Sequence, residues 1–310
     1  MKPLSELKIV FFGTPDFAVA SLAALVEAGL QVVAVVTAPD KPSGRGLQMH
    51  ETPVKQYALS QNILVLQPPK LKSPDFLESL KKLDADLHIV VAFRMLPELV
   101  WNMPPMGTVN VHGSLLPQYR GAAPINWAIM NGATETGVTT FKLKHEIDTG
   151  NILLRQKVAI LPEDNAGTIH DKLMVAGAEL LVKTVKGLAE NTIEEIPQDT
   201  IAEPLRHAPK IFKEDMRIDW NKDAQAIINH IRGLSPYPAA FTTLEGKNIK
   251  IFTAKMENGR PNISTGNYET DHKTFLRFAA KDAWVSILDL QQEGKKRMEI
   301  KAFLSGFRGK

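Results

Sequence analysis

The sequence predicts an α/β fold, in which a Rossmann-like, mostly parallel sheet is followed by a smaller, OB-like β-barrel domain. Short apolar runs alternate with amphipathic stretches over roughly the first 190 residues, which is typical of a parallel sheet covered by helices. Short β-type segments separated by turns fill about the last hundred residues. The length of 310 residues also exceeds what one hydrophobic core usually supports.

Five buried strands are predicted in the first part of the chain, at Lys8–Phe12, Gln31–Thr37, Ile63–Leu66, Leu87–Val91 and Thr108–His112. Amphipathic helices are predicted between them, at Phe17–Ala28, Pro53–Ser60, Pro74–Lys82 and Leu96–Trp101. Asp16 is placed to cap the first helix and Gly29 to end it. Ligands of such sheets bind beyond the carboxyl ends of the strands, and His112 stands at one of these ends.

Two further strands, Thr136–Leu143 and Asn151–Ile160, are predicted on either side of a turn at Asp148. A long amphipathic helix follows at Gly167–Ala189. The C-terminal part is predicted to contain one helix and five short strands, at Lys222–Ile231, Ala239–Leu244, Asn248–Ala254, Phe275–Ala279, Val285–Leu290 and Arg297–Ile300.

The domain boundaries follow from a polar stretch with two prolines and little periodicity, residues 191–207, which is the predicted linker. We therefore expect a catalytic domain over residues 1–190 and a β-barrel domain over residues 208–310. The formal net charge of +3 is unevenly divided between them. Residues 208–310 hold 18 Lys and Arg against 12 Asp and Glu (+6), whereas the first 207 residues hold 19 against 22 (−3). A basic C-terminal domain suggests a polyanionic partner; a solvated lysine-rich surface is the alternative.

The absence of cysteine excludes disulfides, iron–sulfur clusters and thiolate zinc sites, and favours a reducing, cytoplasmic setting. The first residues contain no apolar stretch typical of a signal peptide, and no later run approaches the roughly 20 apolar residues of a membrane span. His145-Glu146 begins like a zinc-binding HExxH motif, but Thr149 replaces its second histidine. We therefore expect no metal and no membrane partner.

Three polar side chains near the middle of the chain are suited to acyl transfer. Asn110 and His112 are two residues apart on a predicted strand, so they point to the same side of it. Both can donate hydrogen bonds to one developing oxyanion. Asp148 lies in a turn-type sequence, where its carboxylate could orient His112 or take a proton from an attacking amine through water. Asn110, His112 and Asp148 are the predicted catalytic residues.

The segment Asn110–Pro117 (NVHGSLLP), followed by RGAAP from Arg120 and by Asp148-Thr-Gly, resembles the folate-dependent formyltransferases. Further segments are similar to the branch of that family that acts on methionyl-tRNA, namely FGTPDF from Phe12, GRG from Gly44, PVK from Pro53, IHDK from Ile169, IDW from Ile218 and IRGLSP from Ile231. The resemblance spans nearly the whole chain and implies the formyltransferase fold.

The resemblance implies transfer of a formyl group from 10-formyltetrahydrofolate to the amino group of methionyl-initiator tRNA, in support of translation initiation. Asn110 and a positively charged His112 would hold the tetrahedral oxyanion, while Asp148 would keep His112 charged and help to move the proton. The enzyme is expected to act as a cytoplasmic monomer. By the same resemblance, the tetrahydrofolate site would be lined by Ser114, Leu115, Leu116 and Pro117.

The polar loop Ala38–Thr52 is the second candidate site, because Lys41 and Arg45 stand there among Gly and Pro beyond a strand end. The resemblance implies that this loop enters the end of the acceptor stem, where Arg45 and Lys41 would bind phosphates or exposed bases. The basic C-terminal domain would contact the tRNA backbone without reading its sequence. Arg94 stands where many relatives have a small residue, and could meet the glutamate tail of the folate or remain a surface arginine.

Several other functions share some of these sequence features. Related folate-dependent formyltransferases act on a small amine such as glycinamide ribonucleotide or an amino sugar nucleotide, and would share the catalytic triplet. The single Asp148-Thr-Gly argues against an aspartic protease, which needs two copies or a short chain that dimerises. A dinucleotide-binding oxidoreductase would need GxGxxG after the first strand, and a hydrolase built on Ser114 would need a GxSxG turn. An RNA-binding module alone would leave the triplet unexplained.

Overall fold

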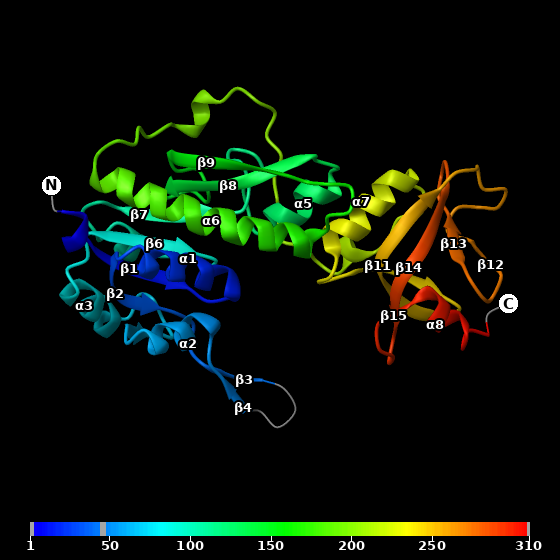
Figure 1. The fold of residues 1–310 in the computed structure, drawn as a ribbon, viewed down its shortest axis with the longest axis horizontal. Coiled ribbons are helices and arrows are strands. Elements are labelled where there is room, and N and C mark those ends of the chain that lie inside the picture. Colours follow the sequence, from blue (N-terminus) through cyan, green and yellow to red (C-terminus); the bar gives the residue numbers. More distant parts are fainter. Residues whose placement is uncertain (1–2, 44–47, 309–310) are drawn as a thin grey trace. The chain divides into compact units, whose positions relative to one another are not determined.

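The first sheet is built around five parallel strands that are hydrogen-bonded in the order β5-β2-β1-β6-β7, with β8 and β9 beyond β7. The computed structural model describes residues 3–43 and 48–308 (Figure 1). β8 runs antiparallel to β7. The strands are β1 (Lys8–Gly13), β2 (Gln31–Val36), β5 (Leu64–Leu66), β6 (Leu87–Val91), β7 (Thr108–His112), β8 (Glu135–Lys142) and β9 (Ile152–Ala159). The predicted α/β fold with a mostly parallel sheet is confirmed.

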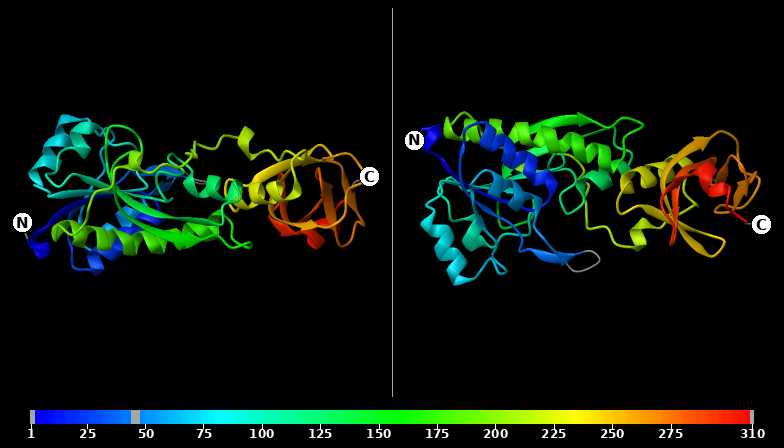
Figure 2. Two further views of the ribbon diagram at one scale, coloured as in Figure 1. Left: turned by 90° about the horizontal axis from the view of Figure 1, so that it is seen from above. Right: turned by 60° about the horizontal axis from the view of Figure 1, so that its bottom comes forward.

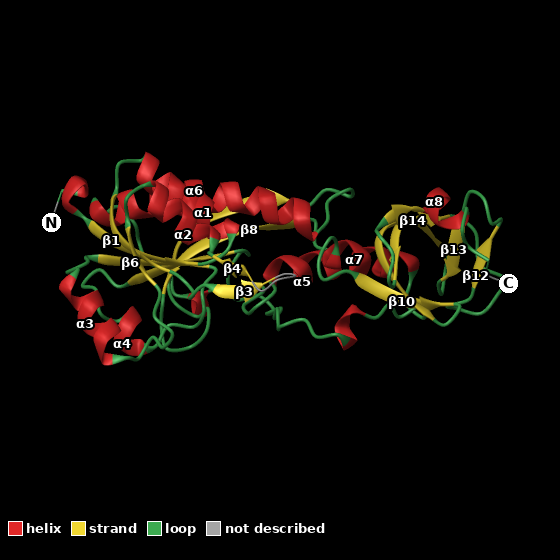
Figure 3. Ribbon diagram, turned by 90° about the horizontal axis from the view of Figure 1, so that it is seen from below, coloured by secondary structure: helices red, strands yellow, loops and turns green. Residues whose placement is uncertain are grey.

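Helices cover both faces of this sheet, with α1, α2 and α6 on one face and α3 and α4 on the other (Figure 3). All five residues of β6 are buried, as expected for a central strand covered on both sides. Phe12, Val36 and Val90 pack with Phe76 and Leu80 of α3 in one hydrophobic cluster. The helices are α1 (Asp16–Glu27), α2 (Pro53–Ser60), α3 (Pro74–Lys82), α4 (Glu98–Trp101) and α6 (Ala166–Ala189).

The ends of α1 were only partly predicted. Gly29 adopts a φ of +73° just beyond the helix, which few residues other than glycine adopt without strain. Asp16 does not cap the helix, because Pro15 occupies the N-cap position and Asp16 is the first helical residue. Its negative charge in the first turn still interacts favourably with the positive end of the helix dipole.

The segment predicted as the polar loop Ala38–Thr52 contains a short antiparallel hairpin, β3 (Lys41–Ser43) and β4 (Gln48–His50). Figures 1 and 2 show the hairpin extending away from the first sheet. Strands of three residues are too short to give a hydrophobic period, so the sequence pattern did not reveal them. Arg45 lies outside the described residues.

The C-terminal sheet is antiparallel throughout and forms a half-barrel, with the strand order β10-β11-β14-β13-β12 and β15 paired to β14. This confirms the second, smaller β domain. Its strands are β10 (Ala240–Leu244), β11 (Lys247–Glu257), β12 (Tyr268–Thr270), β13 (Leu276–Ala279), β14 (Trp284–Gln292) and β15 (Met298–Glu299).

Three helices belong with this second sheet: α5 (Pro124–Met130), α7 (Ala224–Leu234) and α8 (Ile300–Leu304). The strand predicted at Arg297–Ile300 is wrong at its end, because Ile300 begins α8. Ile300, Phe303 and Leu304 recur at helical spacing and bury their side chains against the sheet.

The chain forms two units, each with its own core. The first consists of Met1–Arg120, Gly137–Val158 and His170–Arg206; the second consists of Gly121–Thr136, Ala159–Ile169 and His207–Lys310. Two segments that precede α7 in the chain, Gly121–Thr136 and Ala159–Ile169, therefore belong to the same unit as the C-terminal sheet. Among the described residues, no helix is long and apolar enough to cross a membrane.

Candidate active site

β7 presents Asn110 and His112 on the same side, because strand side chains alternate. His112 is the last residue of the strand and is buried, whereas Asn110 is half-buried. β7 is held between β6 and β8, where Asn110 is in register with Val90 and Phe141. The sheet therefore fixes the backbone of both polar residues at the carboxyl end of a central strand.

The ring of His112 is oriented by a carbonyl oxygen. Its Nε2 lies 2.9 Å from the Tyr119 carbonyl oxygen, and because a carbonyl can only accept, Nε2 carries the proton. Tyr119 adopts a φ of +59°, an uncommon conformation that turns the chain back over His112. With Nε2 engaged, Nδ1 is the nitrogen that faces Asp148, whose Oδ2 is 3.8 Å away.

Asp148 occupies the turn between β8 and β9, at a φ of +55°. Aspartate tolerates this conformation better than most residues. Gly150 brings the turn against β8, since a Cβ there would lie 1.5 Å from the Lys142 carbonyl oxygen. Thr149 Oγ1 also donates to the Glu146 carbonyl at 3.0 Å. The distance of 3.8 Å to His112 exceeds a hydrogen bond, so Asp148 and a charged His112 form an ion pair.

Two residues that sequence reasoning did not assign to the site hold the Asp148 turn. Gln198 is 4% exposed, and its Nε2 donates to the carbonyl oxygens of Asp148 at 2.8 Å and Gly150 at 2.7 Å. Its Oε1 accepts from Arg120 Nε at 3.0 Å and Nη2 at 2.7 Å. Gln198 comes from the predicted linker, where no periodicity marks it, so the sequence alone offered no signal.

The segment predicted to line a folate site, Ser114 to Pro117, follows β7 directly and is pinned to β8. Ser114 and Leu116 are fully buried, and Pro117 is buried as well. Thr139 Oγ1 donates to the Ser114 carbonyl at 2.7 Å and accepts from the Leu116 amide at 3.0 Å. Leu115 is half-buried. The side chains of Ser114 and Leu116 therefore lie in the protein interior, and part of the backbone of this segment is hydrogen-bonded to Thr139.

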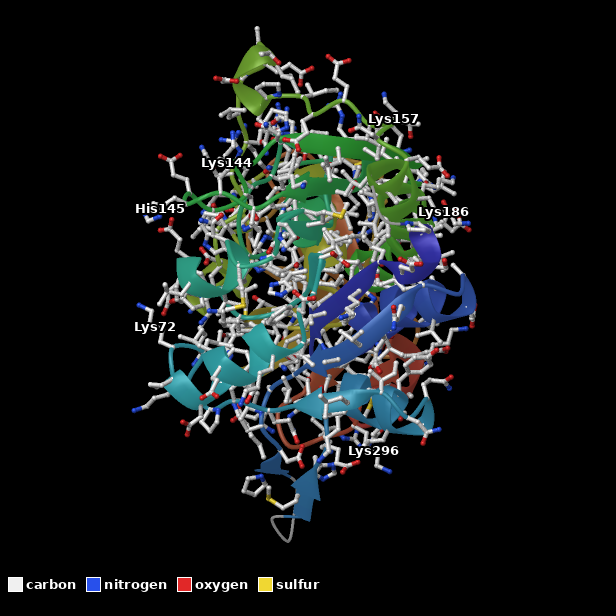
Figure 4. The ribbon with its side chains drawn as sticks, turned by 90° about the vertical axis from the view of Figure 1, so that its left-hand side faces the viewer. Lys72, Lys144, His145, Lys157, Lys186 and Lys296 are labelled. Atoms are coloured by element: carbon white, nitrogen blue, oxygen red, sulfur yellow. The ribbon has the colours of Figure 1, made fainter. Side chains whose placement is uncertain are left out.

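A cavity of about 700 Å³ lies alongside the Asp148 turn and is lined by Trp101, Lys144, His145 and Thr149, among other residues. Lys144 and His145 project at the surface from the loop after β8 (Figure 4). The His145 Nδ1 is 3.9 Å from a Glu98 carboxylate oxygen, which brings α4 to the same loop. The cavity therefore has an aromatic wall, basic groups at its edge and Asp148 beside it.

The other predicted residues come earlier in the chain, before β7. Lys41 is exposed on β3 of the hairpin, and Arg45 is outside the described residues. Arg94 stacks on Phe93 with 5.5 Å between guanidinium carbon and ring centroid, and donates to the Pro69 carbonyl at 3.0 Å. Its guanidinium is thus engaged by the protein itself. Among the described residues, no group of three or more His, Cys, Asp or Glu side chains could hold a metal ion.

Comparison with known proteins identifies the family. Residues 7–185 match the family model described as formyl transferase, and residues 210–308 match the formyl transferase C-terminal domain. The chain belongs to the formyl transferase family. This formyl transferase is 52% identical over 309 residues to the methionyl-tRNA formyltransferase of Bacteroides fragilis. The match covers 97% of this chain and 95% of the relative. The chain is 54% identical over 312 residues to the enzyme of the same name from Parabacteroides distasonis, covering 98% and 96%.

Solved structures share the fold of this formyl transferase. The N-formyltransferase of Helicobacter canadensis, in complex with folinic acid and dTDP-3-aminofucose, superimposes with a TM-score of 0.68. The two chains are 20% identical, and the match covers 94% of this chain and 100% of the other. A formyl transferase must stabilise negative charge on the formyl oxygen while an amine attacks. Asn110 and His112 are the polar pair at the strand end suited to that task.

Proposed function

We propose that this formyl transferase moves the formyl group of 10-formyltetrahydrofolate to the amino group of methionine esterified to initiator tRNA. The observation that carries the proposal is the identity of about half of all residues, over 97% of the chain, to a methionyl-tRNA formyltransferase. That match includes the C-terminal unit and the hairpin segment. The proposed catalytic residues are Asn110, His112 and Asp148.

The proposed chemistry follows from the geometry of these three groups. Asn110 Nδ2 and the protonated Nδ1 of His112 would donate hydrogen bonds to the formyl oxygen as the attacking amine makes its carbon tetrahedral. Asp148, 3.8 Å from Nδ1, would favour the charged ring. Asp148 would also accept the proton lost by the amine, directly or through water. The bond between the formyl carbon and N10 would then break as this proton is passed on to N10, which releases tetrahydrofolate and restores the Asp148 carboxylate.

The folate is proposed to occupy the cavity beside the Asp148 turn. Its volume of about 700 Å³ lies within the range of cavities that bind small molecules. Trp101 offers an aromatic wall for a flat ring, and Lys144 and His145 offer positive charge at the edge for the acidic tail of the donor. None of the residues from Ser114 to Pro117, which the sequence predicted to line the folate site, lines this cavity.

The tRNA is proposed to contact two regions. Lys41 and Arg45 of the β3–β4 hairpin would bind the end of the acceptor stem. The C-terminal unit would bind phosphates through its excess of lysine and arginine. These contacts select an aminoacylated tRNA, whereas the catalytic triplet alone selects only an amine.

The test is formyl transfer by the purified chain with three acceptors: methionyl-initiator tRNA, glycinamide ribonucleotide and an amino sugar nucleotide. We expect formylation of the tRNA with a kcat/KM at least 100-fold above that for either small amine, an estimate based on the large polyanionic contact area. Uncharged initiator tRNA is the control and should inhibit competitively without being formylated. Equal or faster transfer to a small amine would reassign the acceptor.

A further inference from the structure

The segment between α6 and the second unit is fastened to the loops that carry the proposed catalytic residues. We name residues 196–206 the strap. At its beginning, Ile196 and Ile152 exchange two backbone hydrogen bonds of 2.8 and 2.9 Å. At its end, the Arg206 carbonyl accepts from the Tyr119 amide at 2.6 Å. Figure 1 shows the strap running back over β9 after α6 ends.

Gln198 is the residue of the strap whose side chain enters the site region. Both N–H groups of its amide donate to carbonyls of the Asp148 turn, and both lone pairs of its oxygen accept from Arg120. Its hydrogen-bonding capacity is therefore fully used, in a position that is 4% exposed. The partners also fix the orientation of the amide, because the carbonyls can only accept and the guanidinium can only donate.

This arrangement requires glutamine. Glutamate at position 198 would accept from Arg120 equally well, but it would turn a second oxygen toward two carbonyl oxygens. Asparagine is one methylene shorter and would not span the same partners. Arg120 in turn directly follows Tyr119, whose carbonyl oxygen orients the His112 ring. The Arg120–Gln198 pair therefore links the two loops on which His112 and Asp148 depend.

We propose that Gln198, held by Arg120, is a positioning residue that sets Asp148 at its working distance from His112. The proposal rests on the proposed function, since it assigns Asp148 a part in formyl transfer. Asp148 stands at a positive φ in the turn between β8 and β9, and Gln198 contacts the carbonyl of Asp148 itself in addition to that of Gly150. A displacement of about 1 Å at a catalytic group can cost on the order of 100-fold in rate.

The experiment replaces Gln198 and measures kcat and KM separately for both substrates. Gln198→Met keeps the volume of the side chain and removes its hydrogen bonds. We expect kcat to fall roughly 10- to 100-fold while the KM for methionyl-tRNA changes less than about threefold. The KM for the folate is the less decisive quantity, because Gln198 lines the cavity proposed for the donor. Gln198→Glu should lose at least as much as Gln198→Met, because its carboxylate repels the two carbonyls. Arg120→Lys keeps the charge but not the two-pronged contact, and should lose less than either.

A double-mutant cycle separates positioning from general loss of structure. In an Asp148→Asn background, assayed with enzyme in excess over tRNA, adding Gln198→Met should change the rate less than about threefold, because the group it positions is already gone. Thr200→Ala is the matched control: it removes a 2.6 Å hydrogen bond within the same turn, to the Pro197 carbonyl, and should keep kcat within twofold of the wild type.

Three results would overturn the proposal: a Gln198→Met enzyme with wild-type kcat, a loss confined to KM, or a full additional loss in the Asp148→Asn background. If Gln198→Met lowers the thermal unfolding midpoint by more than a few degrees, the double-mutant cycle with Asp148→Asn is measured with Gln198→Glu and Arg120→Lys instead. Wild-type protein that formylates no tRNA would instead refute the proposed function, so the two failures are distinguishable.

Discussion

The neighbours of the His112 ring determine which of its nitrogens carries the proton in the neutral form. The Tyr119 carbonyl accepts a hydrogen bond from Nε2–H, and Asp148 faces Nδ1. In the neutral ring Nδ1 would only accept, and it becomes a donor when the ring is protonated. The nearest carboxylate oxygen of Asp148 is 3.8 Å from Nδ1, which is beyond hydrogen-bond distance, so Asp148 does not occupy this nitrogen.

Removal of either partner is expected to abolish the reaction without unfolding the chain. His112→Ala and Asp148→Ala should each lower kcat for methionyl-tRNA by 100-fold or more, because each removes stabilisation of the oxyanion. Circular dichroism and the thermal midpoint should remain close to those of the wild type, and Glu179→Ala, an exposed change on α6, should retain normal turnover. Retention of more than about a tenth of wild-type kcat by His112→Ala would refute its assignment.

At this scale the sequence predicted the placement of two side chains on one strand, but not the hydrogen-bond partners around them. The spacing of Asn110 and His112 placed both on one side of a strand, and β7 has the predicted bounds. Tyr119 acts through its backbone carbonyl, and Arg120 and Gln198 act through hydrogen bonds between residues that are 78 and 50 positions apart in the chain. Such contacts leave no local periodicity, so they became visible only with the fold.

The β3–β4 hairpin is an element whose two ends are tied together by one lysine. Lys55 Nζ lies 2.5 Å from Asp40 Oδ2 before the hairpin and 3.0 Å from Glu51 Oε1 after it. The hydrogen bond to Asp40 raises the pKa of Lys55 and lowers that of Asp40, so both stay charged near neutral pH. Gln67 Nε2 also donates to Asp40 at 2.7 Å. This clasp gives the exposed hairpin a defined base.

Cutting the clasp is expected to weaken tRNA binding specifically. Lys55→Met should raise KM for methionyl-tRNA several-fold, because the proposed tRNA-binding hairpin loses its fixed direction, while kcat and KM for the folate stay within twofold. Lys82→Met is the control, since it removes an exposed 2.7 Å ion pair with Glu78 on α3, away from the hairpin. Steady-state kinetics with each substrate varied in turn would check this. An unchanged KM for tRNA would argue that the clasp does not matter for binding.

Secondary structure with a strong period was predicted closely, and the misses have identifiable causes. β6, β7, α2 and α3 have the predicted bounds, because buried apolar runs and Pro at the first helical turn mark them clearly. α5 was missed because Pro124–Met130 is short, and α8 because a β-type tripeptide precedes it. The strap lies within the stretch that was predicted as a linker from its polar composition. Its Gln198 nevertheless makes specific hydrogen bonds to Arg120 and to the Asp148 turn.

At the scale of the whole molecule, the uneven distribution of charge predicts that the two substrates differ in how strongly salt affects their binding. The residues from 208 onward carry a net +6 and the rest carry −3, so salt should act on the polyanion far more than on the folate. Between 50 and 200 mM KCl we expect KM for methionyl-tRNA to rise by about tenfold or more, as counterion release predicts for several phosphate contacts. KM for 10-formyltetrahydrofolate, measured in the same buffers, should change less than threefold. A tRNA KM that is flat over this range would rule out a large phosphate-contact contribution.

Global stability should fall in acid partly because of one buried histidine. His88, at the second position of β6, is 1% exposed and packs against Phe12 with 5.2 Å between ring centroids. Burial lowers its pKa from 6.5 to about 4. Between these values the unfolded chain binds a proton that the folded chain excludes, so stability is lost as the pH falls from about 6.5 toward 4. The contribution at pH 4 amounts to about 3 kcal/mol at most, from roughly 1.4 kcal/mol per pKa unit.

Replacement of this histidine by a group that does not titrate should reduce the loss of unfolding free energy as the pH falls from 6.5 to 4. His88→Gln will change stability at pH 7 through packing, so the quantity to compare is the loss of unfolding free energy between pH 6.5 and 4. Urea titrations followed by circular dichroism should show a loss smaller by about 1–3 kcal/mol in the variant than in the wild type. His145→Gln is the control, because that side chain is 88% exposed and should leave the wild-type slope unchanged. Parallel pH dependences for His88→Gln and the wild type would show that carboxylates alone govern acid unfolding.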